Sequence, residues 1–196
     1  MNRRDVMTSA ALGAALIPSV AFAQPAKTGR RGPPLLTVTG AIVRTNRGPL
    51  DPALDQLMQK HKVTFDKAYT FDFATIAALP SVTIKPTLEY DEKPHTLTGP
   101  LLTDLVKVAA PNLPDSAKLL LRAIDGYALV VPLADARRYR FIVAHGLDGQ
   151  PIPLGGLGPL WAVYDADRFP DMAAKPVNQR FASCPWGLYH IDVQQG

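Results

Sequence analysis

Side chains able to do chemistry are few and scattered in this sequence of 196 residues. Cys184 is the only cysteine, which excludes an intramolecular disulfide, an internal redox pair and a zinc site built from several cysteines. No HExxH motif, Ser/His/Asp order or paired-carboxylate arrangement is apparent along the chain. Any site must therefore be assembled from residues that lie far apart in the sequence.

Two positions could still meet a ligand. His145 ends the apolar run 140–145, so its ring either reaches a ligand beside the following loop or serves as a structural histidine. Gly156 lies in a glycine-rich stretch, residues 155–159, whose backbone N–H groups could bind a phosphate or an oxyanion; a flexible loop is the alternative. This stretch lacks the strand–GxGxxG–helix context that a dinucleotide-binding site requires, so such a site is excluded here.

Basic and aromatic residues add further candidates. Arg137, Arg138 and Arg140 form a local basic cluster, which either makes salt bridges on a solvated face or holds an anion. We expect His95 to be a surface histidine in the loop before Gly99. The two tryptophans are expected in the core or in the wall of a pocket.

The elements that must position these residues are short. The chain has 19 prolines and 14 glycines, which disfavours a helical bundle and favours short strands joined by turns. Periodicity and turn signals predict strands over residues 35–43, 63–65, 81–88, 118–124, 128–132, 140–145, 160–164 and 188–193. They predict short helices over residues 51–61, 72–78, 101–109 and 135–138. The sequence therefore predicts a single mixed, strand-rich α+β domain with short helices.

The first 23 residues read as a cleavable export signal. Arg3 and Arg4 precede an apolar stretch, and cleavage after Ala23 fits the small-residue rule. The start partly resembles a twin-arginine signal, although Val6 stands where Phe is usual; an ordinary secretory signal and a retained anchor are the alternatives. We therefore expect a periplasmic protein with no stable membrane span after cleavage. A flexible leader is predicted over residues 24–34, followed by the domain over residues 35–196.

The charge balance argues against nucleic acid as a partner. The net charge is +4, and removing the predicted signal leaves 19 basic and 16 acidic side chains, a net charge of +3. The one basic run, formed by Lys27, Arg30 and Arg31, lies in the Gly/Pro-rich leader, where we expect a solvated tether. No nucleic-acid partner is predicted.

Short motifs stand in a recognisable order along residues 35–193. They are Leu36-Thr37-Val38-Thr39-Gly40, Thr98-Gly99-Pro100-Leu101-Leu102-Thr103-Asp104-Leu105, Ala123-Ile124-Asp125-Gly126-Tyr127, Val131-Pro132-Leu133, Phe141-Ile142-Val143-Ala144, Asp148-Gly149-Gln150-Pro151-Ile152-Pro153, Gly158-Pro159-Leu160 and Trp186-Gly187-Leu188. This order resembles the molybdopterin-binding oxidoreductase domain, the fold of sulfite oxidases and periplasmic sulfoxide reductases. The resemblance implies a fold of the sulfite-oxidase type and electron transfer at a molybdenum–pterin centre.

Two departures from the family pattern bear on that chemistry. The catalytic members hold molybdenum through a cysteine thiolate, and Thr87 stands at the corresponding position here. Relatives often have arginine directly after Gly-Pro-Leu, where this chain has the apolar Trp161. Cys184 lies in a different element and is not expected to replace the missing thiolate.

The resemblance also implies a pocket beside the turn Asp125-Gly126-Tyr127, although a plain strand-connecting turn is the alternative. The predicted pocket residues are Thr87, Asp125, Tyr127, His145, Gly156 and Trp161. No catalytic residue and no metal ligand is assigned among them.

These observations predict an exported domain like those of the molybdopterin-binding oxidoreductases, without the thiolate that ligates molybdenum. We expect no bound cofactor, with molybdopterin as the alternative. The predicted partner is a small anionic or pterin-like ligand, or another protein of the cell envelope. One alternative is an active molybdopterin-dependent oxidoreductase whose metal is ligated by solvent or a hydroxyl group. The other is an envelope module that only binds proteins.

Overall fold

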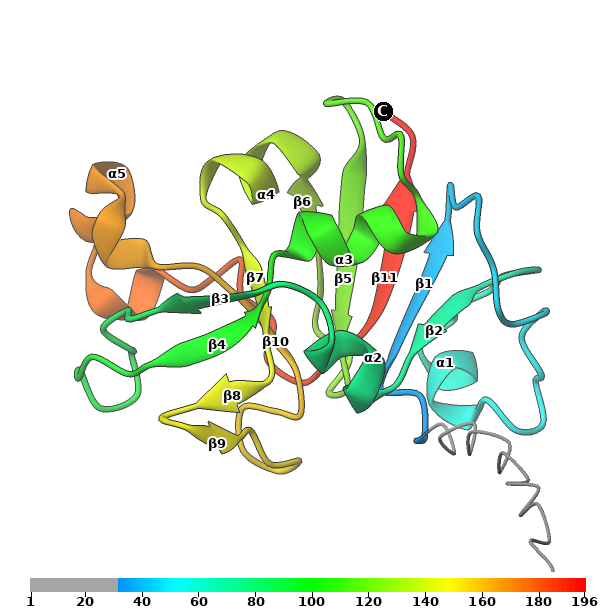
Figure 1. The fold of residues 1–196 in the computed structure, drawn as a ribbon, viewed down its shortest axis with the longest axis horizontal. Helices are drawn as coiled ribbons and strands as arrows, with labels where there is room; N and C mark the ends of the chain where they lie inside the picture. Colours follow the sequence, from blue (N-terminus) through cyan, green and yellow to red (C-terminus); the bar gives the residue numbers. More distant parts are fainter. Residues whose placement is uncertain (1–31) are drawn as a thin grey trace, which may run out of the picture. The chain divides into compact units, whose positions relative to one another are not determined.

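The computed structural model describes residues 32–196, so the predicted signal and leader residues 24–31 lie outside the described residues. The largest sheet has five strands in the order β2-β1-β11-β5-β6 (Figure 1). These strands are β2 (Tyr69–Phe71), β1 (Leu36–Gly40), β11 (Leu188–Gln194), β5 (Lys118–Ala123) and β6 (Ala128–Pro132). Strands β1 and β11 are parallel, and the other three pairs are antiparallel. The first and last strands of the described chain therefore lie side by side.

Six further strands form two smaller sheets. The four-stranded antiparallel sheet contains β3 (Ser81–Ile84), β4 (Leu97–Pro100), β8 (Gly146–Leu147) and β9 (Gln150–Pro151). The two-stranded sheet pairs β7 (Ile142–Ala144) with β10 (Trp161–Val163). Strand β4 passes directly over β7, where Gly99 faces the carbonyl group of Val143. This close approach joins the two smaller sheets.

The helices are short connections between strands. They are α1 (Gln56–Lys60), α2 (Phe73–Ala77), α3 (Leu102–Ala109), α4 (Leu133–Arg138) and α5 (Pro170–Ala173), with 3-10 turns η1 (Ala166–Arg168) and η2 (Val177–Gln179). Helix α3, which Figure 1 shows in front of β5 and β11, buries an apolar face. The buried residues of that face are Leu102, Leu105, Val106 and Ala109.

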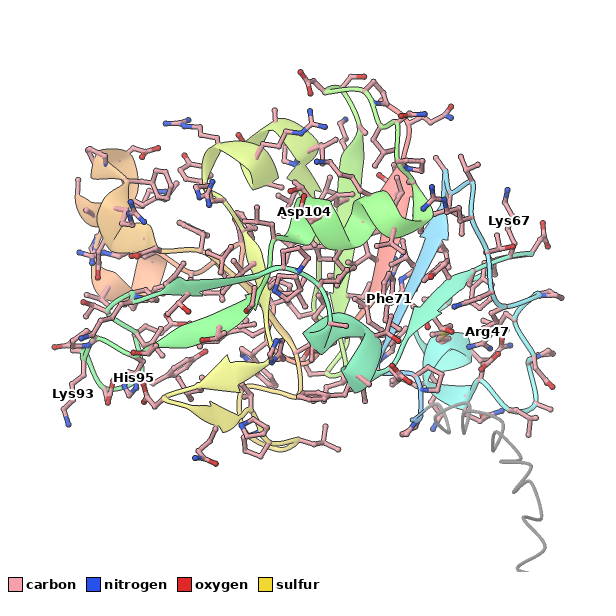
Figure 2. The ribbon with its side chains drawn as sticks, viewed as in Figure 1. Arg47, Lys67, Phe71, Lys93, His95 and Asp104 are labelled. Atoms are coloured by element: carbon pink, nitrogen blue, oxygen red, sulfur yellow. The ribbon has the colours of Figure 1, made fainter. Side chains whose placement is uncertain are left out.

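One large hydrophobic cluster joins the three sheets. Its largest fully buried side chains include Trp161 from β10, Phe141 before β7 and Phe71 from β2, the last of which is labelled in Figure 2. A smaller cluster of Met58, Val63 and Tyr189 packs beside α1. Since the large cluster draws on every sheet, residues 32–196 pack as one compact unit.

The structure confirms the predicted class, a mixed and strand-rich arrangement with few short helices and several sheets. The helices predicted over residues 72–78 and 101–109 correspond to α2 and α3. The turn predicted at residues 125–127 joins β5 to β6. Local periodicity and capping were sufficient at these places: Asp72, for example, caps α2 by accepting the amide of Thr75.

Several local predictions are wrong, and the strand predicted over residues 81–88 ends at Ile84. Residues 63–65 form no strand, and Val63 instead buries its side chain in the small cluster. The helix predicted from residue 51 begins only after Asp55, because the Asp51 carboxylate caps a separate turn by accepting the amide of Ala53. Strand β4 was missed because Gly99 and Pro100 are typical turn residues, whereas here the glycine is needed for a close strand crossing.

The crossing of β4 and β7 predicts that Gly99→Ala is destabilising. A Cβ at this position would overlap the carbonyl oxygen of Val143, and backbone cannot move aside as a flexible side chain can. We expect the free energy of unfolding to fall by about 1–3 kcal/mol or more, as overpacking typically costs. Gly48→Ala is the matched control, because nothing lies within 4 Å of a Cβ there. Chemical denaturation measures both changes; equal effects would contradict the close crossing.

Candidate functional site

A cavity of about 240 Å³ lies where three segments meet, and we call it the acidic pocket. The segments are residues 89–90 after β3, the β5–β6 turn, and residues 181–186 before β11. The lining includes Glu89, Tyr90, Asp125, Tyr127, Cys184 and Trp186. No lysine, arginine or histidine is among its lining residues. Residues remote in sequence thus combine two carboxylates with several aromatic rings.

The β5–β6 turn builds one side of the acidic pocket. Asp125 accepts the amide of Tyr127 at 2.9 Å, and Gly126 between them has a φ of 94°, which glycine adopts without strain. The Tyr127 hydroxyl donates to the carbonyl of Ala182 at 2.8 Å, across to the segment before β11. The turn interpretation of this motif therefore holds, and the turn places Asp125 and Tyr127 in the lining of this cavity. That this cavity is the pocket implied by the family resemblance stays a prediction.

Tryptophans and the lone cysteine form the back of the pocket. Trp161 is buried and donates its indole N–H to the carbonyl of Cys184 at 2.9 Å. An isolated β-bridge joins Trp161 to Trp186, which lines the cavity while Trp161 does not. Trp161 therefore supports the pocket from the core side and holds the cysteine segment in place.

Burial and negative charge determine the protonation of this lining. Burial raises the pKa of the Cys184 thiol well above its ordinary value, and the charge of Glu89 raises it further. Partial burial, the charge of Glu89 and a hydrogen bond to it raise the pKa of Tyr90 to about 12. Around neutral pH the thiol of Cys184 and the phenol of Tyr90 are therefore both uncharged.

Thr87 lies close in sequence to Glu89 but does not line the acidic pocket. Its amide donates to Asp167 at 2.7 Å, and it forms an isolated β-bridge with Pro94. Residue 87 is therefore held toward η1, which carries Asp167. Thr87, which stands where the resembled family has its metal ligand, is therefore not one of the residues that line this pocket.

His145 and Gly156 also lie outside the acidic pocket. His145 follows β7 and packs edge-on against the ring of Phe73 at 5.4 Å, and burial lowers the pKa of its imidazole. Its Nε2 is buried and has no hydrogen-bond partner among residues 32–196. Gly156 is exposed, and its N–H donates to the carbonyl of Pro153 at 3.2 Å. Of the six predicted pocket residues, Asp125 and Tyr127 line this cavity.

Sequence reasoning missed three of the residues that do line it, Glu89, Tyr90 and Cys184, whereas Trp186 lies in a pocket wall, one of the two places expected for the tryptophans. Glu89 and Tyr90 carry no motif, and only the path of the β3–β4 connection brings them to the β5–β6 turn. Cys184 was set aside because it lies far along the chain from residue 87. The Trp186-Gly187-Leu188 motif was the one sequence signal for the lining segment before β11.

The chemistry of this lining does not fit a molybdenum–pterin group. The catalytic members of the resembled family hold molybdenum through a thiolate, whereas Thr87 stands at that position here and the side chain of Cys184 is only 5% exposed. Molybdopterin carries a phosphate, which the carboxylates of Glu89 and Asp125 would repel. No group of three or more His, Cys, Asp or Glu side chains suited to a metal ion occurs in the part of the chain that the structure describes.

Comparison with protein-family models and with curated proteins identified no relative of this chain. No protein-family model matches the chain, and no curated protein matches it. The family resemblance therefore rests on the ordered motifs of the sequence. Within residues 32–196, no helix is long and apolar enough to cross a membrane.

The β3–β4 connection, which carries Glu89 and Tyr90, is fastened at its far end by His95. Figure 2 shows His95 and Lys93 at the tip of this connection. The His95 ring bonds Asp148 in the β8–β9 turn through Nδ1 at 2.7 Å, and Asp91 through Nε2 at 3.0 Å. The hydrogen bond to Asp148 and then that to Asp91 raise the pKa of His95 above its ordinary value. The predicted surface histidine therefore forms a clasp between two loops, with a carboxylate bonded at each ring nitrogen.

This clasp predicts a pH dependence of stability. Because the folded-state pKa of His95 is raised, its stabilisation is complete below the ordinary histidine pKa, about 6.5, and is lost as the pH rises through the folded value. We expect the stability difference between the wild type and His95→Gln to shrink from pH 6 toward pH 9. Urea denaturation at several pH values measures it. Lys93→Gln, in the same loop, should leave this slope unchanged; a constant difference for His95→Gln would contradict the clasp.

Burial of Cys184 predicts a thiol that reacts slowly. Its side chain is 5% exposed and its raised pKa leaves little thiolate at pH 8. We expect a thiol reagent to modify well under a tenth of the native protein in the time that it modifies the unfolded protein completely. Mass spectrometry of both samples measures the modified fraction. Rapid modification of the native protein would mean that the cysteine segment opens readily.

Proposed function

We propose that this chain is an exported ligand-binding domain, built on a fold like that of the molybdopterin-binding oxidoreductases, that works without the molybdenum cofactor. The ordered motifs support the fold and the first 23 residues support export. The observation that carries the absence of the cofactor is the lining of the acidic pocket, which holds two carboxylates and no lysine, arginine or histidine beside the turn Asp125-Gly126-Tyr127. Thr87 at the position of the family's metal ligand points the same way.

The lining of the acidic pocket favours a small organic cation. The carboxylates of Glu89 and Asp125 supply negative charge, and the rings of Tyr90, Tyr127 and Trp186 supply π faces. None of these three rings stacks against another ring among the described residues, so no aromatic neighbour covers them. Aromatic faces beside carboxylates are the usual surroundings of quaternary ammonium groups in proteins.

An anionic or pterin-like ligand, expected from the sequence, has less support at this pocket. A phosphate or carboxylate would approach Glu89 and Asp125 with no cation in the lining to offset the repulsion. An active oxidoreductase with solvent or a hydroxyl at the metal would need the same negatively charged cofactor in the same place. Both ideas remain predictions, and the pocket's charge argues against them.

The absence of a cofactor is tested by metal and pterin content. The protein is purified after export with its own signal from a molybdate-fed host, and molybdenum and released pterin are measured per mole. We expect both far below one equivalent. Thr87→Cys should also stay free of molybdenum, because residue 87 does not line the pocket. Near one equivalent in the wild type would overturn the proposal and make the chain an enzyme with unusual metal ligation.

Cation binding is tested with choline and its uncharged carbon analogue, 3,3-dimethyl-1-butanol, by calorimetric titration. We expect choline to bind and the analogue to bind more weakly, since the cation–π and carboxylate attraction needs the charge. Tyr90→Leu should weaken choline by roughly 2–30-fold, the equivalent of about 0.5–2 kcal/mol for one cation–π contact. Tyr90→Phe keeps the ring and should bind like the wild type.

Variants of the two carboxylates provide a second test of cation binding. Glu89→Gln and Asp125→Asn should each weaken choline, while Glu92→Gln, an exposed neighbour that does not line the pocket, should have no effect. Asn at residue 125 retains an oxygen that can accept the amide of Tyr127, so the turn should survive. Equal binding of choline and its analogue, or loss of binding in Glu92→Gln alone, would contradict a cation site.

A further inference from the structure

A second cavity, of about 200 Å³, lies where β3, the end of α4 and η1 meet. It shares no lining residue with the acidic pocket. In Figure 1, β3, α4 and α5 lie toward the same end of the described domain. Three charged side chains, Arg140, Asp165 and Arg168, line this cavity together with apolar ones. We call it the arginine cavity.

Asp165 is a buried carboxylate that lacks part of its hydrogen bonding. The residue is 8% exposed. Its Oδ2 accepts the amide of Lys85 at a long 3.4 Å, and its Oδ1 is buried with no hydrogen-bond partner among the described residues. Burial raises the pKa of this carboxyl, with the charge of Arg168 acting in the opposite direction. A buried acceptor without a donor is costly, and a ligand that donates to it removes that cost.

Arg140 and Arg168 both have free guanidinium groups. Neither side chain makes an ion pair or a hydrogen bond within residues 32–196. The other members of the basic cluster differ: Arg137 pairs with Asp115 and Arg138 with Asp171. The solvated-face interpretation of the cluster therefore holds for those two, and the anion-holding interpretation is open for Arg140.

The backbone of Arg140 has an unusual conformation. Its φ is 53°, in the left-handed region, at the position after α4 where helices usually end in glycine or asparagine. A residue with a side chain is disfavoured in this backbone conformation. The side chain that this conformation carries lines the cavity.

The remaining lining is apolar. Val82 and Ile84 come from β3, and the ring of Phe169 follows η1. The ring of Tyr139 packs edge-on against that of Phe169 at 5.1 Å, and its hydroxyl is already bonded to Asp171 at 2.5 Å. One part of the cavity therefore suits a hydrocarbon group, and the charged part presents both signs.

We propose that the arginine cavity binds a small zwitterion, a free α-amino acid with an apolar side chain. The ammonium group donates to Asp165, Arg140 and Arg168 donate to the carboxylate, and the side chain packs on Val82, Ile84 and Phe169. A simple anion would meet the Asp165 carboxylate, and a simple cation would meet two guanidinium groups. The cavity is also below the roughly 300–1,000 Å³ of sites for drug-sized ligands, which suits a ligand as small as an amino acid.

The test uses the full protein and three probes in calorimetric titrations. L-Leucine carries both charges, N-acetyl-L-leucine lacks the ammonium and L-leucinamide lacks the carboxylate. We expect saturable binding of L-leucine, and binding about tenfold or more weaker for each derivative. No saturable binding of L-leucine, or equal binding of all three probes, would overturn the proposal.

Variants of the cavity residues test which side chain binds each charged group of L-leucine. Asp165→Asn should weaken L-leucine by about tenfold, because L-leucine brings an ammonium group, and should not weaken N-acetyl-L-leucine, which has none and is repelled by the carboxylate. Arg140→Met and Arg168→Met should each weaken L-leucine and should not weaken L-leucinamide, which lacks the carboxylate that the guanidinium groups bind. Both arginines are exposed, so their variants stay informative if the buried Asp165→Asn fails to fold. Arg137→Met, on α4 and outside the cavity, is the control and should bind like the wild type.

This site is independent of the cation site. Tyr90→Leu should leave the affinity for L-leucine unchanged, and saturating choline should not compete with L-leucine. Competition between the two ligands would place L-leucine in the acidic pocket and would overturn the assignment to the arginine cavity. Unchanged affinity in both Arg140→Met and Arg168→Met would do the same.

Discussion

The pairing of β11 with β1 on one side and β5 on the other is the constraint on which the rest of the structure depends. Strand β11 is the last element of the chain, yet it occupies the middle of the large sheet. Its register against β5 places Leu188 beside Ala123, and the amide of Ile124 donates to the carbonyl of Gly187. The segment before β11 is therefore held against the β5–β6 turn. Without that pairing, the cysteine segment and the turn would have no fixed relation and the acidic pocket would not exist.

The third wall of the pocket depends on polar contacts rather than on a sheet. The connection between β3 and β4 is tied to η1, where Asp167 accepts the amide of Thr87, and to the β8–β9 turn through His95. Such contacts replace the hydrogen bonds that a strand would supply. They also explain why Thr87 faces η1 while Glu89 and Tyr90, two and three residues further on, reach the pocket.

The two cavities differ in charge because they draw on different parts of the chain. The acidic pocket lies at one end of β5 and gathers carboxylates with aromatic rings. The arginine cavity lies beside the end of α4 and combines guanidinium groups with a buried carboxylate. The small net charge of the chain does not show this difference, because the positive and negative charges of the two cavities offset each other in the total. Ligand chemistry is therefore a property of each cavity and not of the overall composition.

What the sequence determined by itself was local. Capping at Asp72, the apolar face of α3 and the Asp-Gly turn at residues 125–127 follow from hydrogen bonds and periodicities that span a few residues, so a strand-rich class with short helices could be predicted. Only the tertiary structure decided that Cys184 and Glu89 line the same pocket, that Trp161 supports the pocket from the core side and that Gly99 belongs to a strand. Each of these depends on which distant strands pair and how closely they cross, and burial then sets the protonation of the thiol. Pairing and burial are sums over long-range contacts, which no local stretch of sequence contains.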